Sequence, residues 1–230
     1  MLTIYVFDCI DGQTCIIEIM EYKIDLHVHS RSSGDSDAGP EELILQAIHI
    51  GLHGIAFTEH YSYEVSEPVE VLREAYSKYI MVFRGVEFST AEGHCLIFGV
   101  NTDKLLSPLL PVADTLRIVH RQGGAVIPSH PYRGVNSLGD KVKSINGICA
   151  IEGYNGCNLH TFNIKAVETA TAMGIPFTGG SDAHDVQSLG LCYTAFSGRV
   201  SHDNFVDVLK SGNYRGVDTR KISRVSFPFI

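Results

Sequence analysis

Five short segments of this chain place six of its eleven histidines beside carboxylates. Imidazole and carboxylate groups are the ligands that hold zinc, manganese or iron in proteins. One such segment would be weak support. Five in one chain indicate a site for several metal ions, and with it hydrolytic chemistry. The segments cover residues 25–29, 58–60, 85–94, 129–131 and 180–184.

Two of these segments share a spacing of two residues. His27 and His29 lie two apart in a strand-like run, so both side chains point to one face. The alternative for this pair is a polar stripe on an edge strand. Asp182 and His184 repeat the spacing after another apolar run, where the alternative is that Asp182 caps a helix. We interpret both pairs as metal ligands because they occur together.

The other candidates stand singly after or at the start of apolar runs. Glu87 follows one such run, and a carboxylate can bridge two metal ions through its two oxygens. His94 begins the next strand-like run, and His130 follows a third. A lone histidine in such a place is more often structural. His60 is the weakest candidate by itself, because Glu59 beside it could form an ion pair with it.

Strand-like and helix-like segments alternate from residue 23 onward, which predicts mainly parallel strand pairing. All five ligand segments follow an apolar strand. Functional groups collect at the carboxyl ends of strands in α/β barrels and in open α/β sheets, so this placement is stronger support than the number of histidines. The expected strands are 23–28, 54–58, 81–88, 94–100, 125–129, 147–153, 176–180 and 191–196, and the expected helices 40–50, 68–79, 112–121, 159–173 and 201–209.

The first 22 residues differ from the rest of the chain. Two β-rich runs flank Asp11-Gly12, which is a hairpin signal. We therefore expect an N-terminal β-hairpin appendage over residues 1–22 and one α/β domain over residues 23–230. A chain beginning at Met20 would open just before the first ligand strand, so the sequence leaves open whether residues 1–19 are native to the protein.

The net charge of −8 argues against a general nucleic-acid binder, because no basic stripe is available to neutralise phosphates. It does not argue against a small phosphorylated substrate, since bound divalent cations reverse the local field. We expect no stable nucleic-acid complex. The sequence gives no indication of the oligomeric state.

The six cysteines lack CxxC spacing, which favours a reducing compartment. No apolar run reaches the length of a transmembrane helix, and residues 1–22 lack the basic start of a signal peptide. We therefore expect a cytoplasmic protein without membrane contact.

The five segments resemble the polymerase and histidinol phosphatase (PHP) family of metal-dependent phosphoesterases. The resemblance extends from about residue 23 to residue 196 and follows the family's motif order. It implies an α/β fold, a distorted seven-stranded (β/α) barrel that is TIM-like. The matching motifs are DLHVHS (25–30), TEH (58–60), GVEFSTAEGH (85–94), SHP (129–131) and GSDAH (180–184).

The resemblance also implies three divalent metal ions, Zn, Mn or Fe. Asp35 enters only through it, because by itself this residue lies in a Ser/Gly/Asp loop that indicates a turn or a cap. No ligand position of the family is empty here, which argues against a non-catalytic member. The implied ligands are His27, His29, Glu87 and Asp182 for the first ion, Glu87, His94 and His130 for the second, and Asp35, His60 and His184 for the third.

Such a centre hydrolyses a phosphoester with a metal-activated hydroxide, so we expect no protein nucleophile. Arg133 follows His130 by three residues, and we predict that its guanidinium binds a phosphate oxygen. A surface salt bridge is the alternative. Asn155 follows a strand and is predicted to hydrogen-bond the substrate, with a left-handed turn residue as the alternative.

The leading hypothesis is a phosphoesterase that acts on a small phosphomonoester or nucleotide. Only about twenty residues separate His60 from the next expected strand, so no inserted domain lies there. Two alternatives remain. One is a 3′–5′ exonuclease-like phosphodiesterase acting on oligonucleotide ends. The other is a metal-bound regulatory module without turnover, against which the complete ligand set argues.

Overall fold

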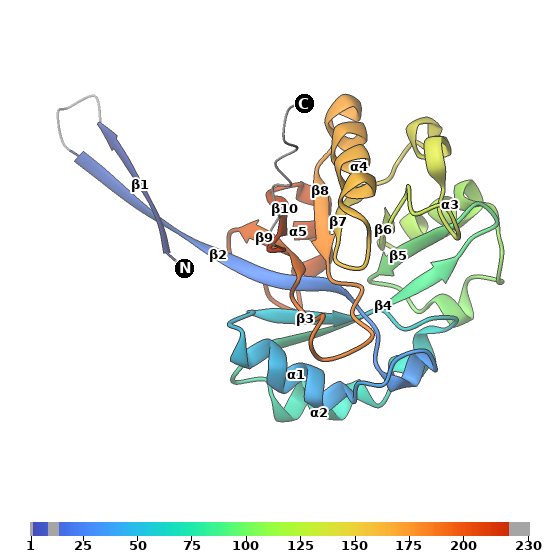
Figure 1. Ribbon diagram of the computed structural model, residues 1–230, viewed down its shortest axis with the longest axis horizontal. Coiled ribbons are helices and arrows are strands. Elements are labelled where there is room, and N and C mark those ends of the chain that lie inside the picture. Colours follow the sequence, from blue (N-terminus) through green and yellow to red (C-terminus); the bar gives the residue numbers. More distant parts are fainter. Residues whose placement is uncertain (1, 9–13, 221–230) are drawn as a thin grey trace, which may run out of the picture.

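The computed structural model describes residues 2–8 and 14–220 (Figure 1). A curled sheet of seven strands in the order β10-β9-β2-β3-β4-β5-β6 forms a half-barrel, and β7 and β8 pair as a second, two-stranded sheet. The strands are β1 (Leu2–Asp8), β2 (Thr14–Val28), β3 (Gly54–Phe57), β4 (Met81–Ser89), β5 (His94–Phe98), β6 (Ala125–Pro128), β7 (Ile151–Asn155), β8 (Phe177–Gly180), β9 (Cys192–Ser197) and β10 (Tyr214–Asp218). The α-helices are α1 (Pro40–His49), α2 (Val69–Ala75), α3 (Val112–Arg121), α4 (His160–Met173) and α5 (Phe205–Ser211).

The mixed α/β class is confirmed, and of the predicted distorted seven-stranded barrel residues 14–220 form a half-barrel that does not close. Within the described residues, the long ladder ends at β6 and β10, while β7 and β8 pair with each other. The chain after β8 still reaches β2, because Asp182 N donates to His27 O at 2.7 Å and His29 N donates to Ala183 O at 3.0 Å. These two hydrogen bonds join two ligand segments that lie far apart in the sequence.

The expectation of mainly parallel pairing is wrong. The pairs β2–β3, β3–β4 and β7–β8 are parallel, whereas β4–β5, β5–β6, β2–β9 and β9–β10 are antiparallel. A short turn can join only antiparallel neighbours, since a parallel pair needs a long crossover. The turn over residues 90–93 between β4 and β5 is such a connection.

Most expected elements are present, with shifted ends. Helix α5 begins at Phe205 rather than at 201, because Asn204 Oδ1 accepts a hydrogen bond from Ser201 N at 2.7 Å and closes a turn before the helix. Strand β10 was not expected from the sequence. Strand β2 is longer than predicted, and its first half pairs antiparallel with β1 and extends away from the half-barrel (Figure 1). The predicted turn at Asp11-Gly12 lies outside the described residues, so the hairpin appendage stays a prediction.

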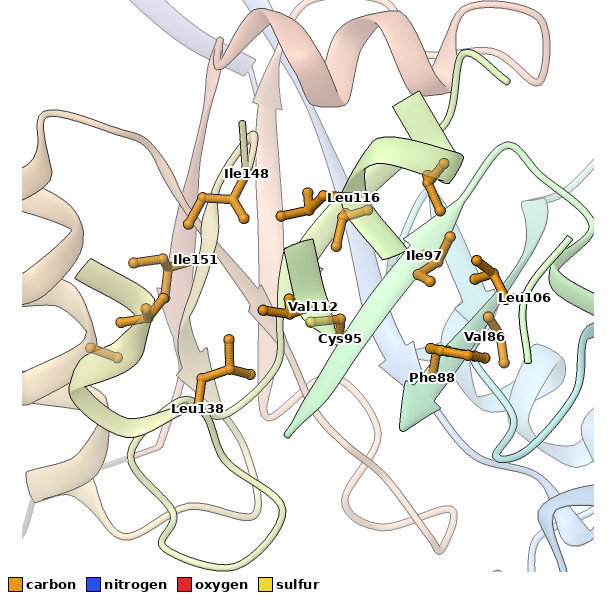
Figure 2. Close-up of a cluster of buried hydrophobic side chains, with 14 of the residues drawn as sticks. Val86, Phe88, Cys95, Ile97, Leu106, Val112, Leu116, Leu138, Ile148 and Ile151 are labelled. Carbon is orange, nitrogen blue, oxygen red and sulfur yellow. The ribbon is translucent and has the colours of Figure 1, made fainter. Parts of the chain in front are cut away.

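Strand alternation separates the core from the site. On β4, Val86 and Phe88 are buried in an apolar cluster with residues of β5 and α3, as Figure 2 shows, while Glu87 between them faces the other side. Strand β2 repeats this pattern. Its apolar residues Ile24 and Leu26 enter a second apolar cluster, whereas His27, which follows Leu26, faces the site. Apolar burial on one face therefore fixes the orientation of the ligands on the other.

The helices of the described residues are too short or too polar to cross a bilayer.

Candidate metal centre

The nine predicted ligand side chains lie together, and we call them the ligand cluster. Glu87 stands at its middle, with carboxylate oxygens 2.7–3.5 Å from ring nitrogens of five histidines. Asp35 connects the outer part of the cluster, because its Oδ2 lies 3.0 Å from His60 Nε2 and 3.3 Å from His184 Nε2. The ligand cluster comprises His27, His29, Asp35, His60, Glu87, His94, His130, Asp182 and His184.

The innermost four ligands have the spacing of a coordination shell. His27 Nε2 lies 3.0 Å from His29 Nε2 and 3.3 Å from Asp182 Oδ1. Glu87 completes the group at 3.4 Å from His27 and 3.5 Å from His29. Metal–ligand bonds of about 2.0 Å to a tetrahedral ion put the donor atoms about 3.3 Å apart. The donor atoms therefore fit a single transition-metal ion.

Two further groups of donor atoms adjoin this one. The first joins His29, Asp35, His60 and His184, and the second joins His60 and His94 to Glu87. Both agree in part with the ligand sets implied by the family resemblance. His60 takes part in the second group, where His130 was expected, yet His130 Nε2 is only 2.7 Å from Glu87 Oε1.

Hydrogen bonds behind the cluster orient the first two imidazoles. His27 Nδ1 lies 2.8 Å from Glu152 Oε1, and His29 Nδ1 lies 3.2 Å from Ser33 Oγ, which donates to Glu59 Oε2 at 2.5 Å. An acceptor at Nδ1 keeps the proton there and leaves the Nε2 lone pair free to bind a metal. Glu59 thus hydrogen-bonds to serines and acts behind His29, rather than pairing with His60.

Two members of the cluster have strained backbones. His130 has φ +30° and Asp182 has φ +56°, a region that residues other than glycine rarely adopt. His130 is held there because its N–H donates to Glu152 Oε2 at 2.7 Å. Backbone strain of this kind is concentrated at functional sites, where the surroundings enforce it.

The electrostatics of the site favour a cation. Burial opposes protonation of His27, but the carboxylates of Asp182, Glu152 and Glu87 raise its pKa well above its usual value. Burial likewise opposes ionisation of Glu87 and Asp182, yet His27 holds the pKa of each carboxyl well below its usual value. Burial lowers the pKa of His29 to about 4, so this imidazole is neutral and able to act as a ligand. Buried carboxylates beside the neutral imidazole of His29 suit a divalent ion, which would take the place of the proton on His27.

Glu152 is the functional residue that sequence reasoning missed. It is 1% exposed, and three donors point at its carboxylate: His27 Nδ1, His130 N and Asn155 Nδ2. The available signal was an acidic residue inside an expected apolar strand. A buried carboxylate requires such partners.

Arg133 and Asn155 both lie beside Asp182. Arg133 Nη2 donates to Asp182 Oδ2 and, at 3.0 Å, to Asn155 Oδ1, while its Nε donates to Asn158 Oδ1 at 2.9 Å. Asn155 is fully buried within β7 and does not have a positive φ. Its Nδ2 donates to Glu152 and Asp182, and its Oδ1 also accepts from Cys157 N. Protein partners therefore occupy the whole Asn155 amide, and the left-handed alternative is wrong.

A cavity of about 300 Å³ lies over the cluster and is lined by Arg133, Val135 and Asn136 together with seven of the ligands. A second pocket, of about 660 Å³, shares Asp35, His60 and His94 with it. The two spaces therefore meet at the outer ligands.

Two family models match the chain. A model described as PHP domain matches residues 25–133, and one described as PHP-associated matches residues 160–214. All nine residues of the ligand cluster fall within these two ranges. The chain belongs to the PHP family of metal-dependent phosphoesterases. The family indicated by the motifs is thus confirmed.

The fold is similar to that of several solved structures. A two-domain protein containing a predicted PHP-like metal-dependent phosphoesterase, from Bacteroides vulgatus ATCC 8482, is 20% identical, and the match covers 87% of this chain and 65% of that chain with a TM-score of 0.69. PsfC from Pseudomonas syringae PB-5123 is 17% identical, with 86% and 92% covered and a TM-score of 0.65. The lesion-specific endonuclease PfuEndoQ from Pyrococcus furiosus is 16% identical, with 86% and 58% covered and a TM-score of 0.61.

At these identities the similarity concerns the fold alone, and the chain spans just under two thirds of the Bacteroides protein. No curated protein matches the chain in sequence.

Proposed function

We propose that this PHP protein hydrolyses small phosphomonoesters with a trinuclear centre held by the ligand cluster. The observation that supports this most strongly is Glu87, whose two oxygens lie within 3.5 Å of five imidazoles. A carboxylate in that position suits a bridge between ions. Divalent ions, when bound there, neutralise charge on the phosphoryl oxygens and activate water for attack at phosphorus.

Arg133 has a defined part in this proposal. Its Nη2 and Nε are held by Asp182, Asn155 and Asn158, whereas Nη1 makes no hydrogen bond within residues 14–220. The side chain also lines the cavity above the cluster. A guanidinium fixed on one edge and free on the other suits a non-bridging phosphate oxygen. We assign Asn155 to positioning Arg133 and Asp182, because its own amide has no free donor or acceptor for the substrate.

We expect the purified protein to contain more than one transition-metal ion per chain, since nine ligands exceed what one ion uses. Elemental analysis of protein prepared without chelator, and again after Mn, Zn or Fe supplementation, measures this ratio. A ratio near zero after supplementation would contradict the proposed centre.

The proposed outermost ion can be tested by comparing substitutions at two aspartates that are close in sequence. Asp35 contacts His60 and His184, whereas Asp37 is exposed and lies outside the cluster. We expect Asp35→Ala to lower the metal content by about one ion per chain and to reduce kcat by at least about tenfold. Asp37→Ala, the matched control, is expected to change neither. Equal behaviour of the two variants would remove Asp35 from the ligand set.

A second candidate function is phosphodiester cleavage in nucleic acid. It rests on the fold similarity to endonuclease Q, one structure of which is a complex with a 27-mer duplex substrate containing an abasic lesion. The net charge of −8 argues against it, because phosphate neutralisation needs basic residues. Release of nucleotides from a labelled oligonucleotide at a rate above that on phosphomonoesters would favour this candidate over the first.

A further inference from the structure

Tyr61, next to the ligand cluster, has an unusual backbone. Its φ is +72°, and Ser62 N donates to His60 O at 2.9 Å across it, so Tyr61 is the central residue of a three-residue turn. Turns of this kind with positive φ are rare and strained, especially at a bulky residue. Such strain persists only where the surroundings hold it, and it is concentrated at functional positions.

The chain on both sides of Tyr61 is firmly held. His60 N donates to Ser33 Oγ at 3.1 Å. On the other side, the N–H groups of Tyr63 and Glu64 donate to the two carboxylate oxygens of Asp103, each at 2.7 Å. The turn is therefore a fixed support for the Tyr61 side chain.

The Tyr61 ring is exposed beside the site. The residue is 77% exposed, its ring centroid lies 5.7 Å from that of His60, and it lines the 660 Å³ pocket that meets the cavity over the cluster. Leu109, 64% exposed and also with a positive φ, lines the same pocket. An aromatic ring that a fixed turn holds open at the edge of this pocket is available to contact a ligand.

The charge of this pocket limits what enters it. Asp35 and Glu92 line it, and among the described residues none of its lining side chains is lysine or arginine. Apart from the histidines of the cluster, the charged side chains there are acids, so a second phosphate group would find no lysine or arginine among the described lining residues to neutralise it. An uncharged or cationic ring would meet an aromatic face and an apolar side chain.

We propose that Tyr61 determines substrate specificity by stacking on a planar ring in the leaving group. The substrate class is then a phosphomonoester of a ring-bearing alcohol without further phosphates. This inference rests on the proposed function, because it takes the phosphoryl group of the substrate to bind at the ligand cluster.

Adenosine 5′-monophosphate and ribose 5-phosphate form a matched pair, since the sugar phosphate has a hydroxyl group where the nucleotide has its base. We expect the protein to favour the nucleotide by at least about tenfold in kcat/KM, as stacking of a base on an aromatic side chain predicts. In Tyr61→Ala we expect this preference to fall to within about threefold. The kcat/KM for the nucleotide accounts for the fall, because the kcat/KM for ribose 5-phosphate does not depend on the ring contact. In Tyr61→Phe, which keeps the ring, the preference remains. Tyr79, 71% exposed and not part of this pocket, provides the control variant Tyr79→Ala with the wild-type preference.

The proposal is overturned if Tyr61→Ala keeps the preference, or if it slows both substrates equally, which would mean that Tyr61 only positions His60. Calorimetric affinities of the metal-supplemented protein for the same two compounds separate this proposal from the proposed function. Tighter binding of the nucleotide that is lost in Tyr61→Ala supports the ring contact even if neither compound is hydrolysed. Equal affinities in the wild type overturn it.

Discussion

Replacement of Asp182 by asparagine is expected to lower phosphomonoester hydrolysis by at least about a thousandfold, which corresponds to ~4 kcal/mol of transition-state stabilisation. Asp182 Oδ1 lies 3.3 Å from the Nε2 atoms of both His27 and His29, while its Oδ2 accepts from Arg133 and Asn155. The substitution keeps the shape of the side chain but removes the negative charge that a metal ion bound by the four innermost donors would need. His27→Ala removes another of the four innermost donors and is expected to have a similar effect.

These two variants differ in their cost to stability. Both residues lie near strand ends, which suggests a modest loss in the free energy of unfolding. His27, however, is fully buried, and its removal leaves Glu152 Oε1 without its hydrogen-bond partner. An unpaired buried carboxylate oxygen costs about 1–3 kcal/mol or more, so Asp182→Asn is the sharper test. His49→Ala, at an exposed histidine of α1, is the control. Activity and metal content are measured on variants whose thermal unfolding shows that they are folded. Undiminished hydrolysis by metal-loaded Asp182→Asn would refute the site assignment.

The sequence was sufficient to predict the ligand cluster because ligand identity is local. Most ligands lie within or directly beside an apolar strand, and strand alternation makes a residue between two buried apolar neighbours face the site, as at Glu87 on β4. Spacing of two residues predicted the pairs on β2 and after β8 for the same reason. Asp35 lies in a loop, where no periodicity applies, so only the family motif indicated it.

Sheet topology was less predictable, because it depends on which strands meet rather than on what each strand contains. Alternating strands and helices indicated mainly parallel pairing, but β5 returns antiparallel through the short turn over residues 90–93. Strand β10 and the separate pairing of β7 with β8 had no local signal. The strained turn at Tyr61 was likewise invisible in the sequence, since tyrosine does not indicate a positive φ.

The contacts behind the ligands were not predicted either, because they also depend on which strands meet. Glu152 provides a test of how important these contacts are. Three donors converge on its carboxylate, from His27, His130 and Asn155. In Glu152→Gln the amide has a single oxygen and brings two N–H donors of its own, so at least one of the three donors loses its acceptor. The His27 imidazole is then no longer held with its Nε2 lone pair toward the other donors.

We therefore expect Glu152→Gln to weaken metal binding by about 10–100-fold, the usual effect of removing a partner behind a metal ligand. Because Glu152 acts through His27 and His130 and lies behind the cluster, added metal should restore much of the lost activity. Calorimetric titration with metal measures the metal affinity, and kcat at saturating metal measures how much activity is restored. Glu168→Gln, at an exposed glutamate of α4, is the control.

Unchanged metal affinity with a large loss of kcat would assign Glu152 a role in the chemical step, whereas unchanged metal affinity and unchanged kcat would leave it a structural residue. Restoration by metal is the one result that a purely structural role does not predict, since a misfolded site does not regain activity when more ions are supplied.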